Sequence, residues 1–97
     1  MHVIKKKTLI EFWQLHPDAE GPLRAWYRDA TQAYWVRPTD LTESYQNVRI
    51  IPNSRAIFDI GGNKYRLVVH IFYPYGRVYI RFIGTHAEYD RIDATTI

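Results

Sequence analysis

Residues 55–83, RAIFDIGGNKYRLVVHIFYPYGRVYIRFI, decide the fold of this chain. Two runs of apolar, β-branched and aromatic residues, 55–60 and 64–73, flank Gly61–Gly62–Asn63, a sequence that can supply the positive φ angles of a tight turn. A second turn, PYG, leads into a third run of the same kind at 77–83. The stretch therefore predicts a three-stranded antiparallel meander.

The alternation of side chains along these strands divides them between two faces of the predicted sheet. The apolar face is expected to hold Leu67, Val69 and Ile71, paired with Val78, Ile80 and Phe82. The opposite face is expected to hold the more polar set, Arg66, Val68, His70, Tyr79 and Arg81, with Lys64 beside them at the hairpin turn. One face should therefore pack on helices, while the other should present cations, an imidazole and a phenol.

The first half of the chain has helical periodicity. Residues 6–16 predict a helix whose cap is Thr8, with Glu11 at the spacing of a capping box and an apolar face of Leu9, Phe12, Trp13 and His16. Residues 17–35 predict a second helix, capped by Asp18, with the apolar stripe Leu23, Trp26, Tyr27, Ala30 and Tyr34. The two helices are expected to cover the apolar face of the sheet.

Shorter elements complete the expected fold. Residues 2–4 predict a brief strand, 37–48 a connection with one helical turn, and 85–94 a last short helix with Thr85 as its cap. The chain is thus predicted to be a single α+β domain over residues 1–97, in which two helices pack on one face of a small antiparallel sheet.

Composition limits the classes of protein that this chain can belong to. With 46% apolar and 15% aromatic residues, it is expected to form a packed core and not a disordered segment. The absence of cysteine excludes disulfides and thiolate metal sites. No segment is apolar over a length that would make a signal peptide or a membrane span, so we expect a cytoplasmic protein.

Positive charge is concentrated in the second half of the chain. Between Arg49 and His86 there are six basic residues and a single acid, Asp59, within a total net charge of +3. A basic stretch beside an imidazole suits a polyanion such as nucleic acid, although a solvated basic surface would have the same composition.

The motifs that are missing exclude several kinds of enzyme. The sequence has no phosphate-binding loop of the G-x-x-x-x-G-K-[ST] type and no G-x-S-x-G nucleophile motif. Four scattered histidines without cysteine argue against a zinc site, and no cofactor is expected. What remains is a group of cations with an imidazole and a phenol.

Such a group fits the cleavage of RNA, whose own 2′-hydroxyl can attack the adjacent phosphate. The protein then has to offset charge on the phosphate and move two protons. Arginine forks bind phosphate, histidine exchanges protons near neutral pH, and aromatic rings stack on bases. The candidate catalytic residues are Lys64, Arg66, Arg81, His86 and Tyr89, and the candidate RNA-binding residues are Lys64, Arg66, Arg77, Tyr79 and Arg81.

Each candidate also has a structural explanation. Arg66 can be a solvent-facing strand residue, Arg81 can form an ion pair with Asp59 or Glu88, and Lys64 can be an edge charge. His86 can cap a helix and Tyr89 can close the core. His70, between two apolar residues, is more typical of a structural imidazole. The functional interpretation depends on these side chains meeting at one end of one sheet.

Three segments resemble a known family. Residues 58–73 (FDIGGNKYRLVVHIFY), 78–94 (VYIRFIGTHAEYDRIDA) and 16–28 (HPDAEGPLRAWYR) resemble the HigB toxins of bacterial toxin–antitoxin pairs, which belong to the RelE/ParE superfamily. The YRLV segment, 65–68, is also similar to the wider RelE group, where its arginine contacts the scissile phosphate. The resemblance covers nearly the whole chain.

The resemblance implies a ribosome-dependent mRNA endoribonuclease and a cognate antitoxin of the HigA type, a helix-turn-helix protein. It places Arg66 on the phosphate, His86 as general acid or base, and Tyr89 as a ring that stacks on a base or assists. Two alternatives stay open at this point. One is a protein that binds RNA or ribosome without cutting, and the other is the gyrase-inhibiting branch of the superfamily.

Overall fold

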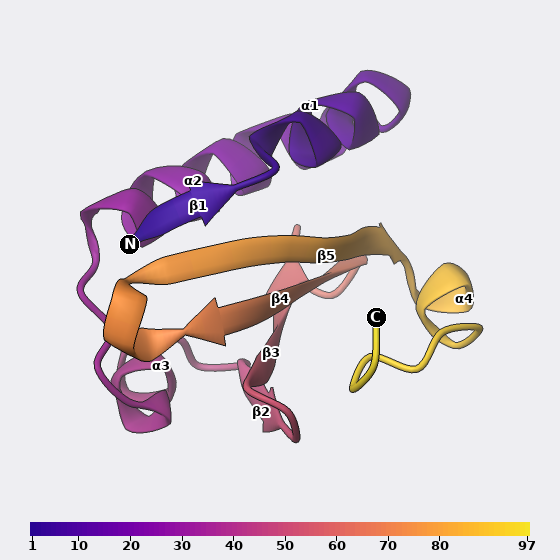
Figure 1. Cartoon of the computed structure of the whole chain (residues 1–97). Coiled ribbons are helices and arrows are strands. Elements are labelled where there is room, and N and C mark those ends of the chain that lie inside the picture. Colours follow the sequence, from indigo (N-terminus) through magenta and orange to yellow (C-terminus); the bar gives the residue numbers. More distant parts are fainter.

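The computed structural model describes all 97 residues and confirms the predicted α+β class (Figure 1). The strands are β1 (His2–Ile4), β2 (Arg49–Ile51), β3 (Arg55–Ile60), β4 (Tyr65–Phe72) and β5 (Arg77–Thr85). The helices are α1 (Lys6–Leu15), α2 (Glu20–Gln32), α3 (Pro38–Ser44) and α4 (His86–Tyr89), with the 3₁₀ turns η1 (Pro17–Ala19) and η2 (Tyr73–Tyr75). The sheet order is β1-β5-β4-β3-β2, so the predicted meander forms the centre and two short strands extend it.

The central hairpin has the predicted turn. Asp59 pairs with Arg66 and Ile60 with Tyr65 across it, and Gly61 and Gly62 take φ angles of +66° and +73°. Asn63 was also expected to have a positive φ and does not, because the two glycines already complete the reversal. At the outer edge, β1 runs parallel to β5, which makes the sheet mixed and not purely antiparallel.

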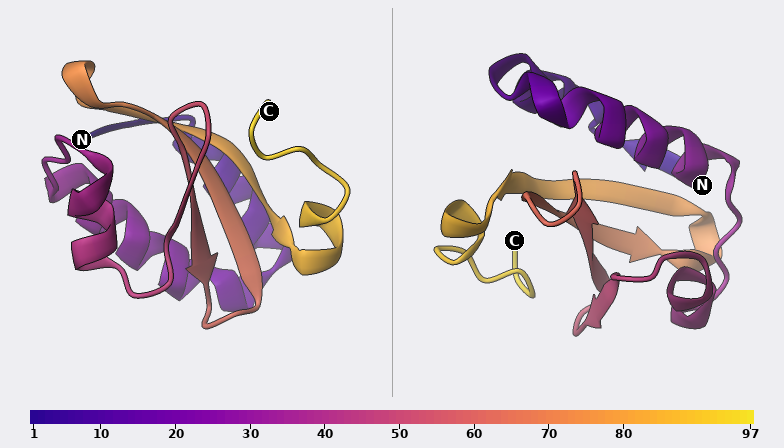
Figure 2. Two further views of the ribbon diagram at one scale, coloured as in Figure 1. Left: turned by 90° about the horizontal axis from the view of Figure 1, so that it is seen from below. Right: turned by 180° about the vertical axis from the view of Figure 1, so that it is seen from behind.

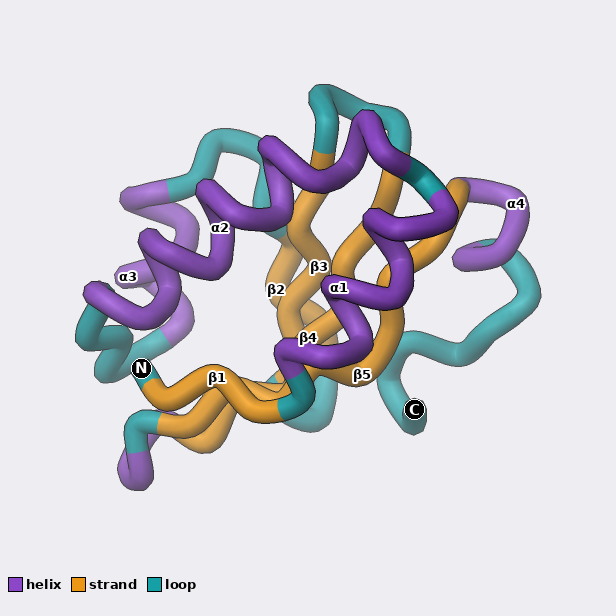
Figure 3. The backbone as a smooth tube through the Cα atoms, turned by 90° about the horizontal axis from the view of Figure 1, so that it is seen from above, coloured by secondary structure: helices purple, strands orange, loops and turns teal.

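Helices α1 and α2 lie side by side over one face of the sheet, as Figure 3 shows. Their buried side chains and those of the sheet form one core, which includes Leu9, Trp13, Leu23, Trp26, Ala30, Leu67, Val69 and Ile71. Each Å² of apolar surface that is buried stabilises the folded state by about 25 cal/mol. This burial is the main contribution that holds the helical layer on the sheet. The predicted apolar face is therefore confirmed for β4.

The ends of the two long helices differ from the predictions. Helix α1 begins at Lys6 after Lys5, whose φ is 75°, so Thr8 lies inside the first turn and makes no cap. Asp18 lies in η1, and its carboxylate accepts hydrogen bonds from Tyr65 of β4 and from Lys64 of the hairpin turn, not from the first turn of α2. Tyr34, expected in the apolar stripe, lies beyond the end of α2 and is 81% exposed, while Trp35 is buried in its place.

A β-bulge changes the face of Phe82. Val69 pairs with Ile80 but Val68 pairs with Phe82, which leaves Arg81 as an extra residue in β5. An extra residue reverses the alternation beyond it, so Phe82 lies on the face of Arg66 and not on the helical face as predicted.

The face opposite the helices is partly covered by the end of the chain, which folds back beside β3 and β4 in Figure 2. A second, smaller apolar cluster of Ile57, Val68 and Ala94 forms there, with Phe82 and Tyr89 packed against it. Arg55 donates to the backbone oxygen of Ile97 at 3.1 Å, and Asn53 donates to that of Thr95 at 2.9 Å. These contacts hold the residues after α4, and therefore α4 itself, against the sheet.

Candidate functional site

Arg66 is the centre of the group that the structure assembles. It lies on β4 between Asp59 of β3 and Gly84 of β5, and its Nε is 4.0 Å from Asp59 Oδ1. The two side chains are each 21% exposed, and Arg66 Nε is buried without a hydrogen-bond partner. A guanidinium that is held in place in this way can bind an anion such as a phosphate through its terminal nitrogens.

Tyr89, on helix α4, also belongs to this group. Its ring centroid lies 4.7 Å from the guanidinium carbon of Arg66 and 5.8 Å from that of Arg49, the first residue of β2. Phe82 lies next to it, with ring centroids 6.4 Å apart. We call Arg49, Asp59, Arg66 and Tyr89 the Arg66 cluster; it joins two cations, a carboxylate and a ring on three strands and one helix.

Helix α4 positions Tyr89 through a capping box. Glu88 N donates to Thr85 Oγ1 at 3.2 Å, and Thr85 N donates to Glu88 Oε1 at 2.9 Å. The backbone hydrogen bond from Thr85 lowers the pKa of Glu88, because it stabilises the ionised carboxylate. The prediction that Thr85 caps the last helix is therefore confirmed, although this helix is only four residues long.

His86 is the first residue of α4, three positions before Tyr89, so both side chains project from a single helical turn. The imidazole is half-buried, and its Nε2 is buried without a hydrogen-bond partner. A buried polar atom without a partner is uncommon in a folded protein, and it singles out this imidazole for a role other than packing.

Two members of the Arg66 cluster were not singled out by the sequence analysis. Asp59 was considered only as an ion-pair partner of Arg81, whereas it pairs with Arg66. Arg49 was counted as a charge without a role, because the three-residue strand β2 follows a connection with no periodic pattern. No signal in the sequence pointed to Asp59, because a three-residue GGN turn would place it opposite Tyr65; it is opposite Arg66 since Lys64 also belongs to the turn.

Lys64 does not join this group. Its amine is bound to Asp18 of η1, in the helical layer, and Tyr65 donates to the same carboxylate at 2.6 Å. The hydrogen bonds from Lys64 and Tyr65 lower the pKa of Asp18, and the same contact raises the pKa of Lys64. The prediction that Lys64 shares the face of Arg66 is wrong because Lys64 precedes β4, and the alternation of the strand does not extend into the turn.

The remaining candidates lie further along the sheet. Arg81 is exposed in the bulge, and Tyr79 is paired with His70. Arg77 is paired with Phe72, six residues along β4 from Arg66, a separation of about 20 Å for an extended strand. The structure therefore brings together Arg66 and Tyr89 but separates Arg77 and Tyr79 from them.

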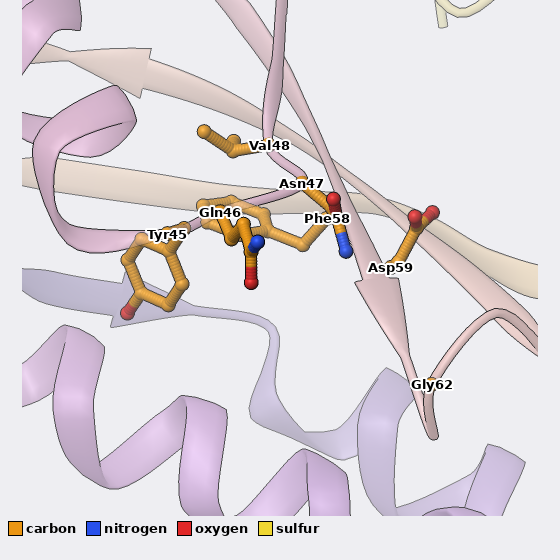
Figure 4. Close-up of a pocket in the computed structure, with 7 residues that line it drawn as sticks. All are labelled: Tyr45, Gln46, Asn47, Val48, Phe58, Asp59 and Gly62. Atoms are coloured by element: carbon orange, nitrogen blue, oxygen red, sulfur yellow. The ribbon is translucent and has the colours of Figure 1, made fainter.

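A pocket of about 170 Å³ opens at the outer edge of β3, between the loop before β2 and the hairpin turn, as Figure 4 shows. It is lined by Tyr45, Gln46, Asn47, Val48, Phe58, Asp59 and Gly62. Asp59 is the only residue that it shares with the Arg66 cluster. None of the predicted site residues lines it, so this pocket is not the predicted phosphate site.

Comparison with known proteins identifies the family. Residues 19–92 match the model of the HigB toxins, described as the RelE-like toxic component of a toxin–antitoxin system. The chain belongs to the HigB toxin family. It is 30% identical over 93 residues to the mRNA interferase toxin HigB of Escherichia coli (strain K12), an alignment that covers 93% of this chain and 88% of that protein. It is 27% identical over 94 residues to the mRNA interferase HigB of Escherichia coli O6:H1, covering 95% and 91% of the two chains.

Family membership confirms the resemblance seen in the sequence and implies an antitoxin partner. The matched range of the HigB toxin model includes every member of the Arg66 cluster and His86.

None of the helices combines the length and the apolar character that a membrane-spanning helix requires.

Gly84 tests how tightly α4 is packed on the strands. A Cβ at this position would lie 2.5 Å from Phe82 Cζ and 3.0 Å from Glu88 Oε1, so Gly84→Ala must displace the ring that supports Tyr89 and the carboxylate that caps α4. We expect a loss of about 1–3 kcal/mol in the free energy of unfolding, measured by urea denaturation.

Gly21→Ala is the matched control for this substitution. Gly21 lies in α2 with no atom within 4 Å of its added Cβ, so its stability should be unchanged or higher. Equal stability of both variants would contradict the packing described here.

Proposed function

We propose that this chain is an mRNA interferase, a metal-independent endoribonuclease that cuts messages on the ribosome and thereby inhibits translation. The names of its relatives in the HigB family support this, since they are mRNA interferases. The observation that carries the proposal is the Arg66 guanidinium, with a buried and unpartnered Nε, stacked on a tyrosine of the helix that begins with His86.

The proposed reaction uses the 2′-hydroxyl of the RNA as its nucleophile. This hydroxyl loses its proton and attacks the adjacent phosphorus, the bond from phosphorus to the 5′-oxygen breaks, and that oxygen takes up a proton. The products are a 2′,3′-cyclic phosphate and a free 5′-hydroxyl. Because RNA supplies the nucleophile, the protein has only to bind the phosphate, offset its charge and transfer protons.

Each role is assigned to a residue of the site. Arg66 binds the scissile phosphate through the terminal nitrogens of its guanidinium, and Arg49 adds a second positive charge near the ring of Tyr89. His86 acts as the general acid or base, and Tyr89 stacks on an unpaired base. Lys64 is held by Asp18 and Arg81 lies in the bulge, so neither is given a step in this reaction.

The partner that we propose is a helix-turn-helix antitoxin of the HigA type, which binds this toxin in the cytoplasm. Membership of a toxin–antitoxin family supports an antitoxin, and the basic second half of the chain supports a partner with acidic segments. Co-purification of the chain with the product of an adjacent helix-turn-helix reading frame tests this pairing.

Mapping of RNA ends in cells tests the nuclease function. The protein is induced beside its Arg66→Ala variant, and new 5′ ends on messages are sequenced. We expect new 5′-hydroxyl ends within translated regions for the unchanged protein and none for the variant. Growth arrest with intact messages and a DNA-damage response would instead assign the chain to the gyrase-inhibiting branch. Translation arrest with intact messages would indicate RNA binding without cleavage.

Tyr89 provides a test of base stacking. The ring touches the guanidinium of Arg66, so Tyr89→Phe keeps both the stacking surface and the cation–π contact. We expect Tyr89→Phe to cleave within about threefold of the unchanged protein, and Tyr89→Ala to lose about ten- to a hundredfold, as stacking energies imply. The measurement is the single-turnover cleavage rate of a ribosome-bound message. A Tyr89→Phe variant as impaired as Tyr89→Ala would show that the phenol takes part in proton transfer.

A further inference from the structure

A second group of rings lies at the other end of the sheet, on the same face as Arg66. The rings of His70 and Phe72 of β4 are tilted against each other with centroids 4.3 Å apart, and Phe72 meets Tyr79 of β5 edge-on at 5.3 Å. Tyr75, in the turn η2 between these strands, is 73% exposed, and Phe72 is 37% exposed. We call these four residues the distal aromatic patch.

The distal aromatic patch is surrounded by positive charge. The guanidinium carbon of Arg77 lies 5.8 Å from the ring of Tyr75, and neither Arg77 nor Arg81 forms a salt bridge. The pKa of His70 is lowered by burial and then by the charges of Arg55 and Arg81, which places Arg81 near this ring. Arg55 donates to backbone oxygens of Asn53 and Ile97, so its donors are already used.

The strands of this surface carry no acidic residue of their own. Strands β4 and β5 and the turn η2 between them, residues 65–85, contain no aspartate or glutamate. Exposed rings beside unpaired arginines are what single-stranded nucleic acids bind, because bases stack on the rings and phosphates pair with the cations. Strands with this composition are complementary in charge to RNA.

The distal aromatic patch is also continuous with the proposed cleavage site. Arg66, Val68, His70 and Phe72 share one face of β4, since the pairing of β3 with β4 has no irregularity. On β4, Val68 is covered by the residues after α4. On β5, Gly84 is opposite Arg66 and Arg77 is opposite Phe72. Arg81 lies between these two positions and is exposed. A strand of RNA can therefore pass along β5 from one group to the other.

We propose that the distal aromatic patch is a second binding site for the messenger RNA, which stacks unpaired bases on Phe72 and Tyr79 about 20 Å from the phosphate at Arg66. The inference rests on the proposed nuclease function. A stacked single strand rises about 3.4 Å per nucleotide, so the span corresponds to about six nucleotides. The patch would add affinity for long RNAs without touching the reacting bond.

Binding of RNAs of two lengths tests this proposal. The probes are 2′-O-methyl oligoadenylates of three and twelve nucleotides, which lack the attacking hydroxyl and cannot be cleaved; their affinity is measured by fluorescence anisotropy. We expect the unchanged protein to bind the longer probe more tightly. A variant with Phe72→Ala and Tyr79→Ala should bind the longer probe at least about tenfold more weakly and the shorter probe equally well.

Further variants separate stacking, charge and folding. Tyr34→Ala is the control, because it removes an equally large exposed ring at the end of α2, and it should change neither affinity. Phe72→Trp should keep tight binding, since it preserves the ring. Arg77→Ala and Arg81→Ala should each reduce the slope of log affinity against log salt by about 0.7 for the longer probe.

Two results would overturn the proposal. One is a wild-type protein that binds both probes equally; the other is a double variant that keeps full affinity for the longer probe. If that variant instead loses only its binding to the purified antitoxin, the patch is a protein interface. Failure of the nuclease function is a separate result, because the unchanged protein would then leave messages intact whatever the patch binds.

Discussion

Replacement of Arg66 with alanine is expected to lower the rate of message cleavage by about two to three orders of magnitude, the usual cost of removing a group that offsets charge in a transition state. The guanidinium is held between Asp59 and Tyr89, so little reorganisation is needed when a phosphate arrives. The measurement is the single-turnover rate on a ribosome-bound message, with growth arrest in cells as a second readout.

Arg66→Lys separates charge from geometry. Lysine keeps the positive charge but lacks the planar fork that binds two phosphate oxygens, so we expect only partial recovery of the rate. Arg24→Ala is the matched control, because Arg24 forms an exposed pair with Glu20 on α2, away from the sheet face of Arg66. Thermal melting of each variant checks that the protein is still folded, because removal of Arg66 leaves Asp59 without its ion-pair partner. Full activity of a folded Arg66→Ala variant would contradict the assignment of the phosphate site.

The central hairpin shows what a sequence predicts well. Two glycines and a run of β-branched and aromatic residues determine the position of the turn and the buried face of β4, because each is a local property of a short stretch. The cap of α4 was predictable for the same reason, since Thr85 and Glu88 meet within one turn. Arg66 and Tyr89 follow from these two local elements.

The bulge at Arg81 shows where such reasoning fails. No residue in β5 marks the insertion, yet it reverses the faces of every residue after it and moves Phe82 beneath Tyr89. Arg49 and the edge strand β2 were missed because a three-residue strand has too little pattern to be recognised. Lys64 was misplaced because its position is decided by a contact with Asp18, 46 residues away in the sequence. Long-range pairings of this kind are not contained in local periodicity.

Replacement of His86 with alanine is the second change for which we expect a large effect, a loss of about a hundred- to ten-thousandfold in the cleavage rate, the range for a general acid or base. The imidazole Nε2 is buried without a partner, so the substitution removes no hydrogen bond of the folded protein. His86→Gln tests proton transfer specifically, because the amide keeps polarity and size but does not titrate in this range. The measurement is the single-turnover rate as a function of pH, since imidazoles exchange protons near neutrality.

Loss of one limb of the pH–rate profile in both variants is the result that assigns proton transfer to His86. A residue that only positioned Tyr89 would lower the rate at every pH and leave the profile unchanged in shape. His2→Ala is the control, because it removes an exposed imidazole of β1, the edge strand furthest from β2 in the sheet. If His86→Gln cleaves as fast as the unchanged protein at all pH values, the proton must be moved by another group. Tyr89 would then be the candidate, since it projects from the same turn and its ring touches Arg66.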